Sequence, residues 1–174
     1  DVYKRQFPSL TGGPSAAVFS SQVSAVFHLV LVHPEIPHNA GAAGRLCLAT
    51  GSTLHLVKPL GFSLDDKQVR RTGLDYWHRV DLKVWDSLEE LLASAAGRIW
   101  LLSTKGEAPL WETRFQPGDY FLCGCESRGL PASLLAAHQD RVVRIPMQER
   151  GTRSLNLATS AAIVLYEAWR QNGG

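Results

Sequence analysis

Short apolar runs of strand character alternate along the chain with segments of helical pattern. We expect strands at 27–33, 53–59, 80–85, 98–104, 119–124 and 141–147. Strands that are separated by helices usually pair in parallel, because the chain crosses over one face of the sheet before the next strand begins. The sequence therefore predicts an α/β fold with a mostly parallel sheet flanked by helices.

The expected helices carry signals at their ends. Helical patterns occupy 39–51, 64–71, 86–97, 130–138 and 154–174. Gly51 stands just past the end of the first helix and Gly97 closes the third, and glycine is the residue that most easily ends a helix. Asp86 or Ser87 is expected to cap the start of the third helix with a side-chain oxygen.

The last helix follows a polar stretch, "QERGTR" (148–153). Ser154 and Asn156 come next, and either side chain can cap the helix. From Leu157 to Leu165 the sequence "LATSAAIVL" is apolar nearly all round the helix. We therefore expect this helix to be buried on several sides or to pack against another subunit.

Length and composition limit the number of domains and the partners. The chain has 174 residues, of which 45% are hydrophobic, so we expect one domain at 27–174 with a single core. Residues 1–26 are rich in Ser, Ala and Gly and do not begin with Met, which predicts a flexible or non-native tail. The formal net charge is only +2, so a polyanion would have to bind at a local patch.

The cysteines favour a reduced protein. Cys47, Cys123 and Cys125 are an odd number and have neither the pattern of a disulfide framework nor the spacing of a zinc site. We expect a cytoplasmic protein that holds no metal. No uncharged run approaches the roughly 20 residues of a membrane span, so we expect no membrane partner.

The glycines of the first helix allow two interpretations. Asn39-x-Gly41-x-x-Gly44 is similar to a dinucleotide-binding fingerprint whose first glycine is replaced, which would indicate a nicotinamide-dependent enzyme. Two prolines separate this pattern from the preceding strand, and the next strand ends in Lys58 instead of an acid, so this hypothesis is the weaker one. The alternative is close packing of the helix on the sheet through Gly41 and Gly44.

Two further features are candidates for a site. Arg45 lies in the small, apolar helix "AGAAGRLCLA", where its guanidinium must reach solvent, a carboxylate or a phosphate. A structural ion pair with Glu35 or Glu126 is the alternative to a functional role. The loop "GCESRGLP" (124–131) follows an expected strand, and open α/β sheets bind ligands beyond the carboxyl ends of their strands. An ordinary turn would also explain this loop.

Three segments in this order resemble the signature motifs of the SPOUT-superfamily RNA 2′-O-ribose methyltransferases. They are "PEIPHNAGAAGRLCLATG" (34–51), "YFLCGCESRGLP" (120–131) and "RIPMQERGTRSLNLATSAAIVLYEAWR" (144–170). The likeness is greatest to the small bacterial enzymes that methylate the wobble nucleotide of tRNA, and it covers roughly 27–171. Two departures are Cys125, where close relatives usually have proline, and a segment between Met147 and Arg153 about one residue longer than in those relatives.

The resemblance implies a knotted fold, which we would not expect otherwise because true knots are very rare in proteins. Members of the family form a C-terminal trefoil knot, bind S-adenosylmethionine bent among the knot loops, and are homodimers with active sites at the subunit interface. By the same resemblance, the residues expected to bind the cofactor are Leu102, Gly124, Ile145, Ser154 and Asn156.

The resemblance also implies roles in catalysis and RNA binding. Arg45 would act on the ribose hydroxyl, with Asn39 and Glu126 positioning it. A guanidinium is a poor base, so we expect Arg45 chiefly to orient the hydroxyl and stabilise developing alkoxide charge. The expected contacts with the tRNA anticodon stem-loop are Arg128 and Arg153 with phosphate, then Lys67, Arg70, Arg71 and Arg79, with Tyr76 and Trp77 able to stack on bases. The alternative for this region is a solvated helix face over a core aromatic.

Two alternatives remain open at this point. The first is a methyltransferase of the same family that acts on another tRNA or ribosomal RNA site, although such relatives usually carry an added RNA-binding domain or long basic extensions. A knotted RNA-binding protein without methyl transfer is the other alternative, and the presence of Arg45, Glu126, Ser154 and Asn156 argues against it.

Overall fold

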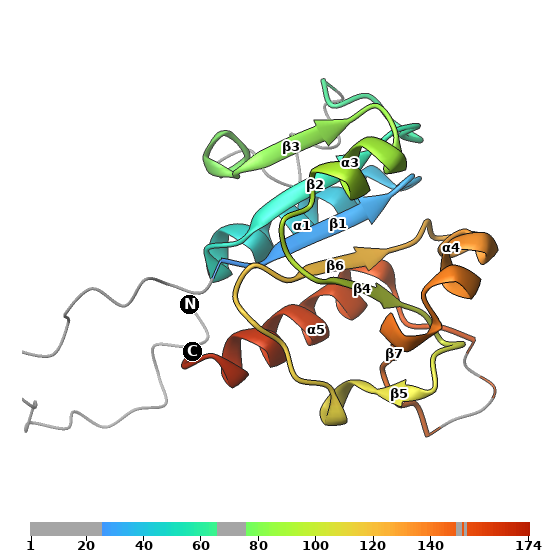
Figure 1. Ribbon diagram of the computed structural model, residues 1–174. Coiled ribbons are helices and arrows are strands. Elements are labelled where there is room, and N and C mark those ends of the chain that lie inside the picture. Colours follow the sequence, from blue (N-terminus) through green and yellow to red (C-terminus); the bar gives the residue numbers. More distant parts are fainter. Residues whose placement is uncertain (1–25, 66–75, 149–150, 152) are drawn as a thin grey trace, which may run out of the picture.

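The computed structural model describes residues 26–65, 76–148, 151 and 153–174 (Figure 1). The strands of the described chain all pair in parallel in one sheet. They are β1 (His28–Val32), β2 (Thr53–Val57), β3 (Leu82–Trp85), β4 (Ile99–Leu102), β5 (Ala108–Pro109), β6 (Tyr120–Cys123) and β7 (Val142–Arg144). The expected parallel sheet is therefore confirmed, with β5 as an additional edge strand.

The strand order is β3-β2-β1-β6-β4-β7-β5. From β1 the chain first moves outward through β2 to β3, and it then crosses back to the other half of the sheet to form β4. Crevices at such a reversal, beyond the carboxyl ends of the strands, are where open α/β sheets bind ligands. The topology thus points to the carboxyl ends of β1, β6 and β4.

The helices are α1 (Pro37–Thr50), α3 (Leu88–Ser94), α4 (Ala132–Ala137) and α5 (Leu157–Gln171), and short 3₁₀ turns are η2 (Trp77–Arg79), η3 (Leu110–Glu112) and η4 (Gln139–Arg141). The expected helix at 64–71 lies mostly outside the described residues. Within the described part of the chain, no helix has both the length and the apolar character to cross a bilayer.

The two faces of the sheet are covered by different helices, because successive strand side chains point to opposite faces. Leu29 and Leu31 join α1 and α5 in one buried cluster. Val30 and Val32 join α3, α4 and the loop before α4 in a second cluster. Figure 1 shows α5 running along α1 and β6, which buries the apolar stripe of the terminal helix within the protein.

The end signals predict some helix boundaries and miss others. α1 ends at Gly51, whose φ of 66° is left-handed as expected, but it begins two residues earlier than expected because Pro37 is well suited to a first turn. α3 is capped by Ser87 and ends at Ser94, three residues before Gly97. The glycine is required for another reason: a Cβ at Gly97 would collide with the carbonyl oxygen of Gly118.

A pair of imidazoles, His55 buried and His28 half-buried, lies on the α3 side of the sheet. The Nδ1 atom of His28 is 3.0 Å from Nε2 of His55, and the indole Nε1 of Trp85 donates to Nδ1 of His55 over 2.9 Å. The hydrogen bond from Trp85 makes Nδ1 of His55 the acceptor, so the proton of neutral His55 sits on Nε2 and is donated to His28. Burial is the main cause that lowers the pKa of His55 to about 4.

This pair predicts a stability that depends on pH. The unfolded chain binds a proton at His55 near pH 6.5, whereas the folded protein resists it, so folding stability is complete above that pH and falls as the pH drops toward 4. We expect His55 to contribute a loss of about 2 to 3 kcal/mol between about pH 7 and pH 4. Urea unfolding of the wild type and of His55→Gln over this range measures the difference.

The control for this prediction is His138→Gln, because His138 is exposed at the end of α4. The pH dependence of its free energy of unfolding should match that of the wild type, while that of His55→Gln should be flatter. Parallel curves for all three proteins would contradict the assignment of the pH dependence to His55.

Candidate active site

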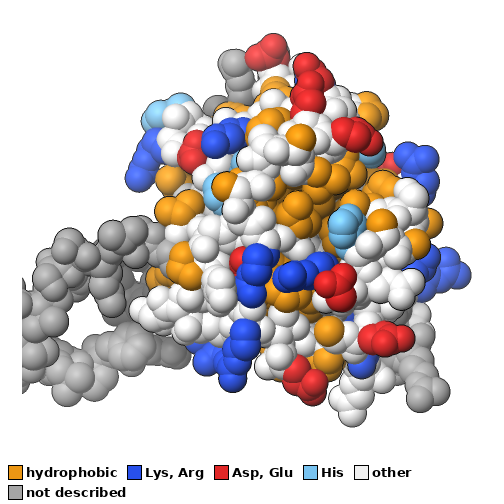
Figure 2. Space-filling view, viewed as in Figure 1, with side chains coloured by type: hydrophobic (Ala, Val, Ile, Leu, Met, Phe, Trp, Pro, Cys, Tyr) orange, Lys and Arg blue, Asp and Glu red, His pale blue; other side chains and the backbone are white. Residues whose placement is uncertain are grey.

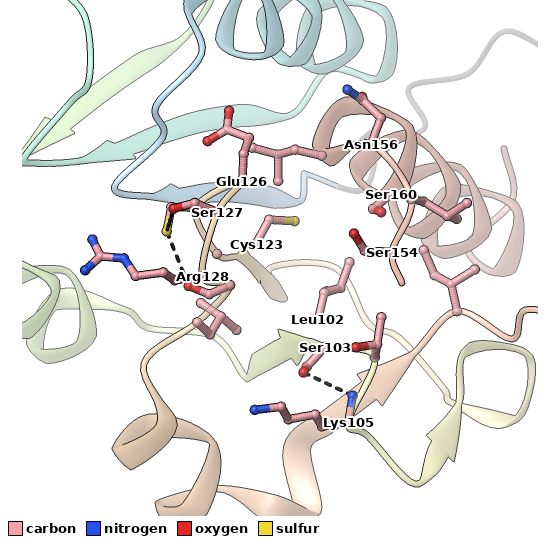
Figure 3. A pocket seen from close by; sticks show the side chains of 18 of the residues that line it. Leu102, Ser103, Lys105, Cys123, Glu126, Ser127, Arg128, Ser154, Asn156 and Ser160 are labelled. Carbon is pink, nitrogen blue, oxygen red and sulfur yellow. Dashed lines mark hydrogen bonds between the residues drawn. The ribbon is translucent and has the colours of Figure 1, made fainter. Parts of the chain in front are cut away.

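A pocket of about 560 Å³ lies beyond the carboxyl ends of β4, β6 and β7 (Figure 3). Its walls come from three segments that are far apart in sequence: 102–105 after β4, 123–130 after β6, and 143–147 with 154–160 around the start of α5. The start of α1 contributes Ile36 and Asn39. The volume falls within the range typical of small-molecule sites.

The pocket brings together most of the residues singled out from the sequence. Its lining includes Leu102, Gly124, Ile145, Ser154 and Asn156, and also Asn39, Glu126 and Arg128. Arg45 and Arg153 are exposed and do not line it. Lys67, Arg70 and Arg71 lie outside the described residues.

Glu126 joins the pocket loop to the start of α1. Its Oε2 accepts a hydrogen bond of 2.7 Å from the backbone N–H of Glu35, and its Oε1 accepts one of 3.1 Å from that of Ile36. The side-chain Nδ2 of Asn39 donates to the same Oε1 over 2.9 Å. The Glu126 carboxylate thus satisfies backbone N–H groups at the start of α1 that have no partner within the helix. Glu126 therefore holds two segments in register and is engaged as an acceptor.

A directed chain of hydrogen bonds extends from Glu126 to α5. The backbone N–H of Thr159 donates to Oδ1 of Asn156, which makes Asn156 the cap of this helix. Nδ2 of Asn156 donates to Oδ1 of Asn39 over 3.1 Å, and Asn39 in turn donates to Glu126. Each amide orientation is fixed by the next partner, so the starts of α1 and α5 are tied together. Of the two expected caps, Asn156 is the one used, which leaves Ser154 in the pocket wall.

Glu35 makes the reciprocal contact. Its carboxylate accepts hydrogen bonds from the backbone N–H and the hydroxyl of Ser127, at 2.9 Å and 2.6 Å. The hydroxyl donor is the main cause that lowers the pKa of the Glu35 carboxyl. Glu35 and Glu126 are thus both occupied within the loop contacts.

Arg45 has an aromatic partner in place of a carboxylate. Its guanidinium carbon lies 4.6 Å from the ring centroid of Tyr76, and among the described residues no ion pair joins it to an acid. The alternative of a structural pair with Glu35 or Glu126 is therefore wrong, because both carboxylates are used by the loop and the helix start.

The expectation that Tyr76 and Trp77 stack on RNA bases needs correction. Tyr76 is buried and donates its hydroxyl to the carbonyl of Gly41 over 3.0 Å. Trp77 is half-buried against α1, where a Cβ at Gly44 would run into its ring. Gly44 is a close-packing glycine, but it packs against the Trp77 ring and not against the sheet. The aromatic pair therefore forms part of the support for α1.

The three cysteines are free and buried, as expected for a reduced protein. Cys123 and Cys125 line the pocket. Burial raises the pKa of Cys123 to about 12, and burial also raises that of Cys47. Thiols that stay protonated are poor nucleophiles, which argues against a covalent role for Cys123 and Cys47 at neutral pH. Within the described segments, no cluster of three His, Cys, Asp or Glu side chains is arranged to hold a metal.

Sequence reasoning did not single out several polar residues of the pocket. Ser103 and Lys105 line it from the turn after β4, and Ser160 lines it from α5 (Figure 3). Ser160 lies four residues after Asn156 and so on the same face of the helix, a spacing that would have identified it. Figure 3 also shows the Arg128 side chain extending away from Leu102 and Ser154.

An open parallel sheet with a pocket beyond the carboxyl ends of central strands is typical of α/β enzymes that bind a small ligand. Comparison with known proteins narrows this class. The sequence profile of the SpoU rRNA Methylase family matches residues 26–166. A tRNA (cytidine(34)-2'-O)-methyltransferase of Methylovorus glucosotrophus is 50% identical over 149 residues, which cover 84% of this chain and 96% of that protein. The chain belongs to the SpoU methylase family.

Solved structures agree with this assignment. A structure that concerns the 2-OH methylation of C/U34 on tRNA superposes with a TM-score of 0.81 at 46% identity, covering 86% of this chain and 97% of that one. The SpoU methyltransferase AviRb from Streptomyces viridochromogenes, in complex with the cofactor AdoMet, has the same fold at 24% identity, with a TM-score of 0.74 and coverage of 86% of this chain and 61% of that one. The resemblance seen in the three sequence segments is confirmed.

Proposed function

We propose that this protein transfers a methyl group from S-adenosylmethionine to the ribose 2′-hydroxyl of the wobble nucleotide, cytidine or a modified uridine, in the tRNA anticodon. The observation that carries the proposal is the pocket in which the three family segments meet. Relatives that this chain matches over nearly their full length are named as methyltransferases of the same position, and this supports the choice of substrate.

The pocket fits the proposed cofactor in size and chemistry. Its lining combines apolar side chains, including Leu102 and Ile145, with the hydroxyls of Ser154 and Ser160. This combination suits a ligand with a flat aromatic base and polar ends. We propose that Leu102, Gly124, Ile145, Ser154 and Asn156 bind it. The bound cofactor would supply an electrophilic methyl group, so the protein has to align the hydroxyl and take up its proton.

Arg45 is proposed to perform the alignment. A guanidinium keeps its positive charge and offers several N–H donors, so it can hold the ribose oxygen and stabilise charge that develops there. Asn39 and Glu126 position α1, which carries Arg45, through their hydrogen bonds to each other and to the helix start. Glu126 already accepts three hydrogen bonds, so we propose that a neighbouring RNA phosphate, and not Glu126, assists the loss of the hydroxyl proton.

RNA binding is proposed to use local positive charge. Figure 2 shows Lys and Arg side chains dispersed over the visible face among Asp and Glu, without one broad basic field. Arg128 and Arg153 are exposed at or beside the pocket and are proposed to hold phosphate, with Lys67, Arg70, Arg71 and Arg79 as further contacts. Contacts this sparse favour weak binding of tRNA and the use of two subunits.

We also propose that residues 27–174 form one domain with a C-terminal trefoil knot, and that two copies of the protein form a homodimer. β7 lies between β4 and β5 although it follows both in sequence, and the segment after β7 returns to the pocket beside the 124–131 loop, a chain course that supports a knot. Tyr166 on α5 keeps 44% of its surface exposed, which supports a contact with a second copy. A cytoplasmic location and independence from metals remain predictions.

The test is transfer of radiolabelled methyl from S-adenosylmethionine to bulk bacterial tRNA, followed by nuclease digestion and mapping of the label. We expect the label on a 2′-O-methylated wobble nucleotide, with activity unchanged by a metal chelator. Label at another tRNA site would move the substrate within the family. No label on tRNA, with S-adenosylmethionine still bound, would point to ribosomal RNA as the substrate. Binding of tRNA without binding of S-adenosylmethionine would identify a non-catalytic RNA-binding protein.

A further inference from the structure

The surroundings of Arg45 raise a question of geometry. An arginine that must hold a substrate oxygen has to be oriented, yet a carboxylate partner would neutralise its charge and occupy its N–H donors. Glu35 and Glu126 are both engaged with backbone and side-chain donors of the pocket loops. Within the described part of the chain no acid forms an ion pair with Arg45, so its N–H donors there are left for another partner.

We propose that Tyr76 is the positioning residue for Arg45, an inference that rests on the proposed function. The guanidinium lies over the Tyr76 ring at 4.6 Å from its centroid, within the range of a cation–π contact. This contact uses the flat face of the guanidinium, whereas its N–H donors lie around the edge. An aromatic ring thus restricts the orientation of Arg45 without consuming the groups that would act on the ribose.

Tyr76 is itself fixed to the helix that carries Arg45. Only 8% of its surface is exposed, and its hydroxyl donates to the carbonyl of Gly41, one turn before Arg45 on α1. Next to it, Trp77 packs against Gly44, where no Cβ could be accommodated without movement. The Tyr76 ring is consequently fixed in position relative to α1, and the Arg45 guanidinium packs against this ring.

Two substitutions separate the ring from the hydroxyl. Tyr76→Phe keeps the aromatic face and loses the hydrogen bond to Gly41, whereas Tyr76→Leu keeps an apolar side chain and loses the aromatic face. We expect Tyr76→Phe to retain methyl transfer within about twofold, and Tyr76→Leu to lower kcat about five- to tenfold with the KM for S-adenosylmethionine unchanged. Thermal unfolding of each variant confirms that the assay measures folded protein.

Combining Tyr76→Leu with Arg45→Gln tests whether Tyr76 positions Arg45 or only supports the fold. If Tyr76 acts through Arg45, Tyr76→Leu should have no further effect on kcat in protein that already carries Arg45→Gln, because the cation is absent. A loss of the same factor in both backgrounds would overturn the inference and assign Tyr76 a purely structural role.

A measurement that needs no substrate tests the contact directly. In protein labelled with ¹⁵N-arginine, the Nε–H resonance of Arg45, identified by its absence in Arg45→Gln, should carry an upfield shift from the Tyr76 ring. We expect the shift to persist in Tyr76→Phe and to vanish in Tyr76→Leu. An unchanged resonance in Tyr76→Leu overturns the inference alone. A wild-type protein that shows this shift but methylates no RNA overturns the proposed function and with it the catalytic part of the inference.

Discussion

Replacement of Arg45 by alanine is expected to abolish methyl transfer to tRNA while leaving the binding of S-adenosylmethionine intact. Arg45 is exposed on α1 and does not line the pocket, so the cofactor should bind with unchanged affinity. The lost guanidinium would remove orientation of the hydroxyl and stabilisation of its developing charge, which together amount to a loss of at least about a hundredfold in kcat. Single-turnover transfer and calorimetric titration measure the two effects separately.

Arg141→Ala is the matched control for this prediction. Arg141 immediately precedes β7, at the amino end of this strand, whereas the pocket lies beyond the carboxyl ends of the strands. The guanidinium carbon of Arg141 lies 5.1 Å from the ring centroid of Trp100. Removal of this arginine deletes the same charge and a comparable aromatic contact, so kcat should stay near that of the wild type. Near-full activity of Arg45→Ala, or an equal loss in both variants, would refute the role assigned to Arg45.

Gly124→Ala is expected to weaken the binding of S-adenosylmethionine about a hundredfold or more, and to lower the free energy of unfolding by about 2 to 4 kcal/mol. A Cβ at this position would collide with the backbone of Gly129 and Leu130. Backbone atoms cannot rotate away as a side chain does, so the 124–130 loop would have to open. The loop forms one wall of the pocket, and the cofactor would lose that wall.

Gly173→Ala tests whether this effect belongs to the site. Gly173 has a left-handed φ of 92°, and a Cβ there would meet no atom within 4 Å. Its replacement should cost about 1 kcal/mol or less through backbone strain near the chain end and leave cofactor binding unchanged. Tight cofactor binding by Gly124→Ala in titration calorimetry would show that the loop tolerates the added methyl group.

The fold was predictable wherever local chemistry determines it. The alternating pattern gave the six longer strands, and Gly51 and Ser87 marked helix ends that the structure retains. β5 was missed because Ala108–Pro109 is too short to carry a period of its own. The insertion of β6 between β1 and β4 depends on the pairing of whole strands in space, and no local pattern contains that information.

The resemblance predicted which residues of the candidate site lie together, but not their contacts, and that they bind the cofactor stays a prediction. The pocket gathers Leu102, Gly124 and Ser154 as expected. The use of Glu126 by the backbone N–H groups of residues 35 and 36 could not be foreseen, because those donors become its partners only when two distant loops meet. Tyr76 was expected to face RNA for a similar reason: an aromatic residue beside basic ones has the same sequence pattern whether its ring is buried or exposed.

The link between Asn156 and Asn39 has a consequence for the synthesis of the protein. Chains are made from the amino end, so β1, α1 and β6 leave the ribosome before α5 exists. Until α5 is made, Asn39 lacks the hydrogen bond from Asn156, and the pocket lacks the wall that carries Ser154 and Ser160. A chain that stops short of its last twenty or so residues would therefore have nowhere to hold the methyl donor, so incomplete products of translation should be inactive from the outset.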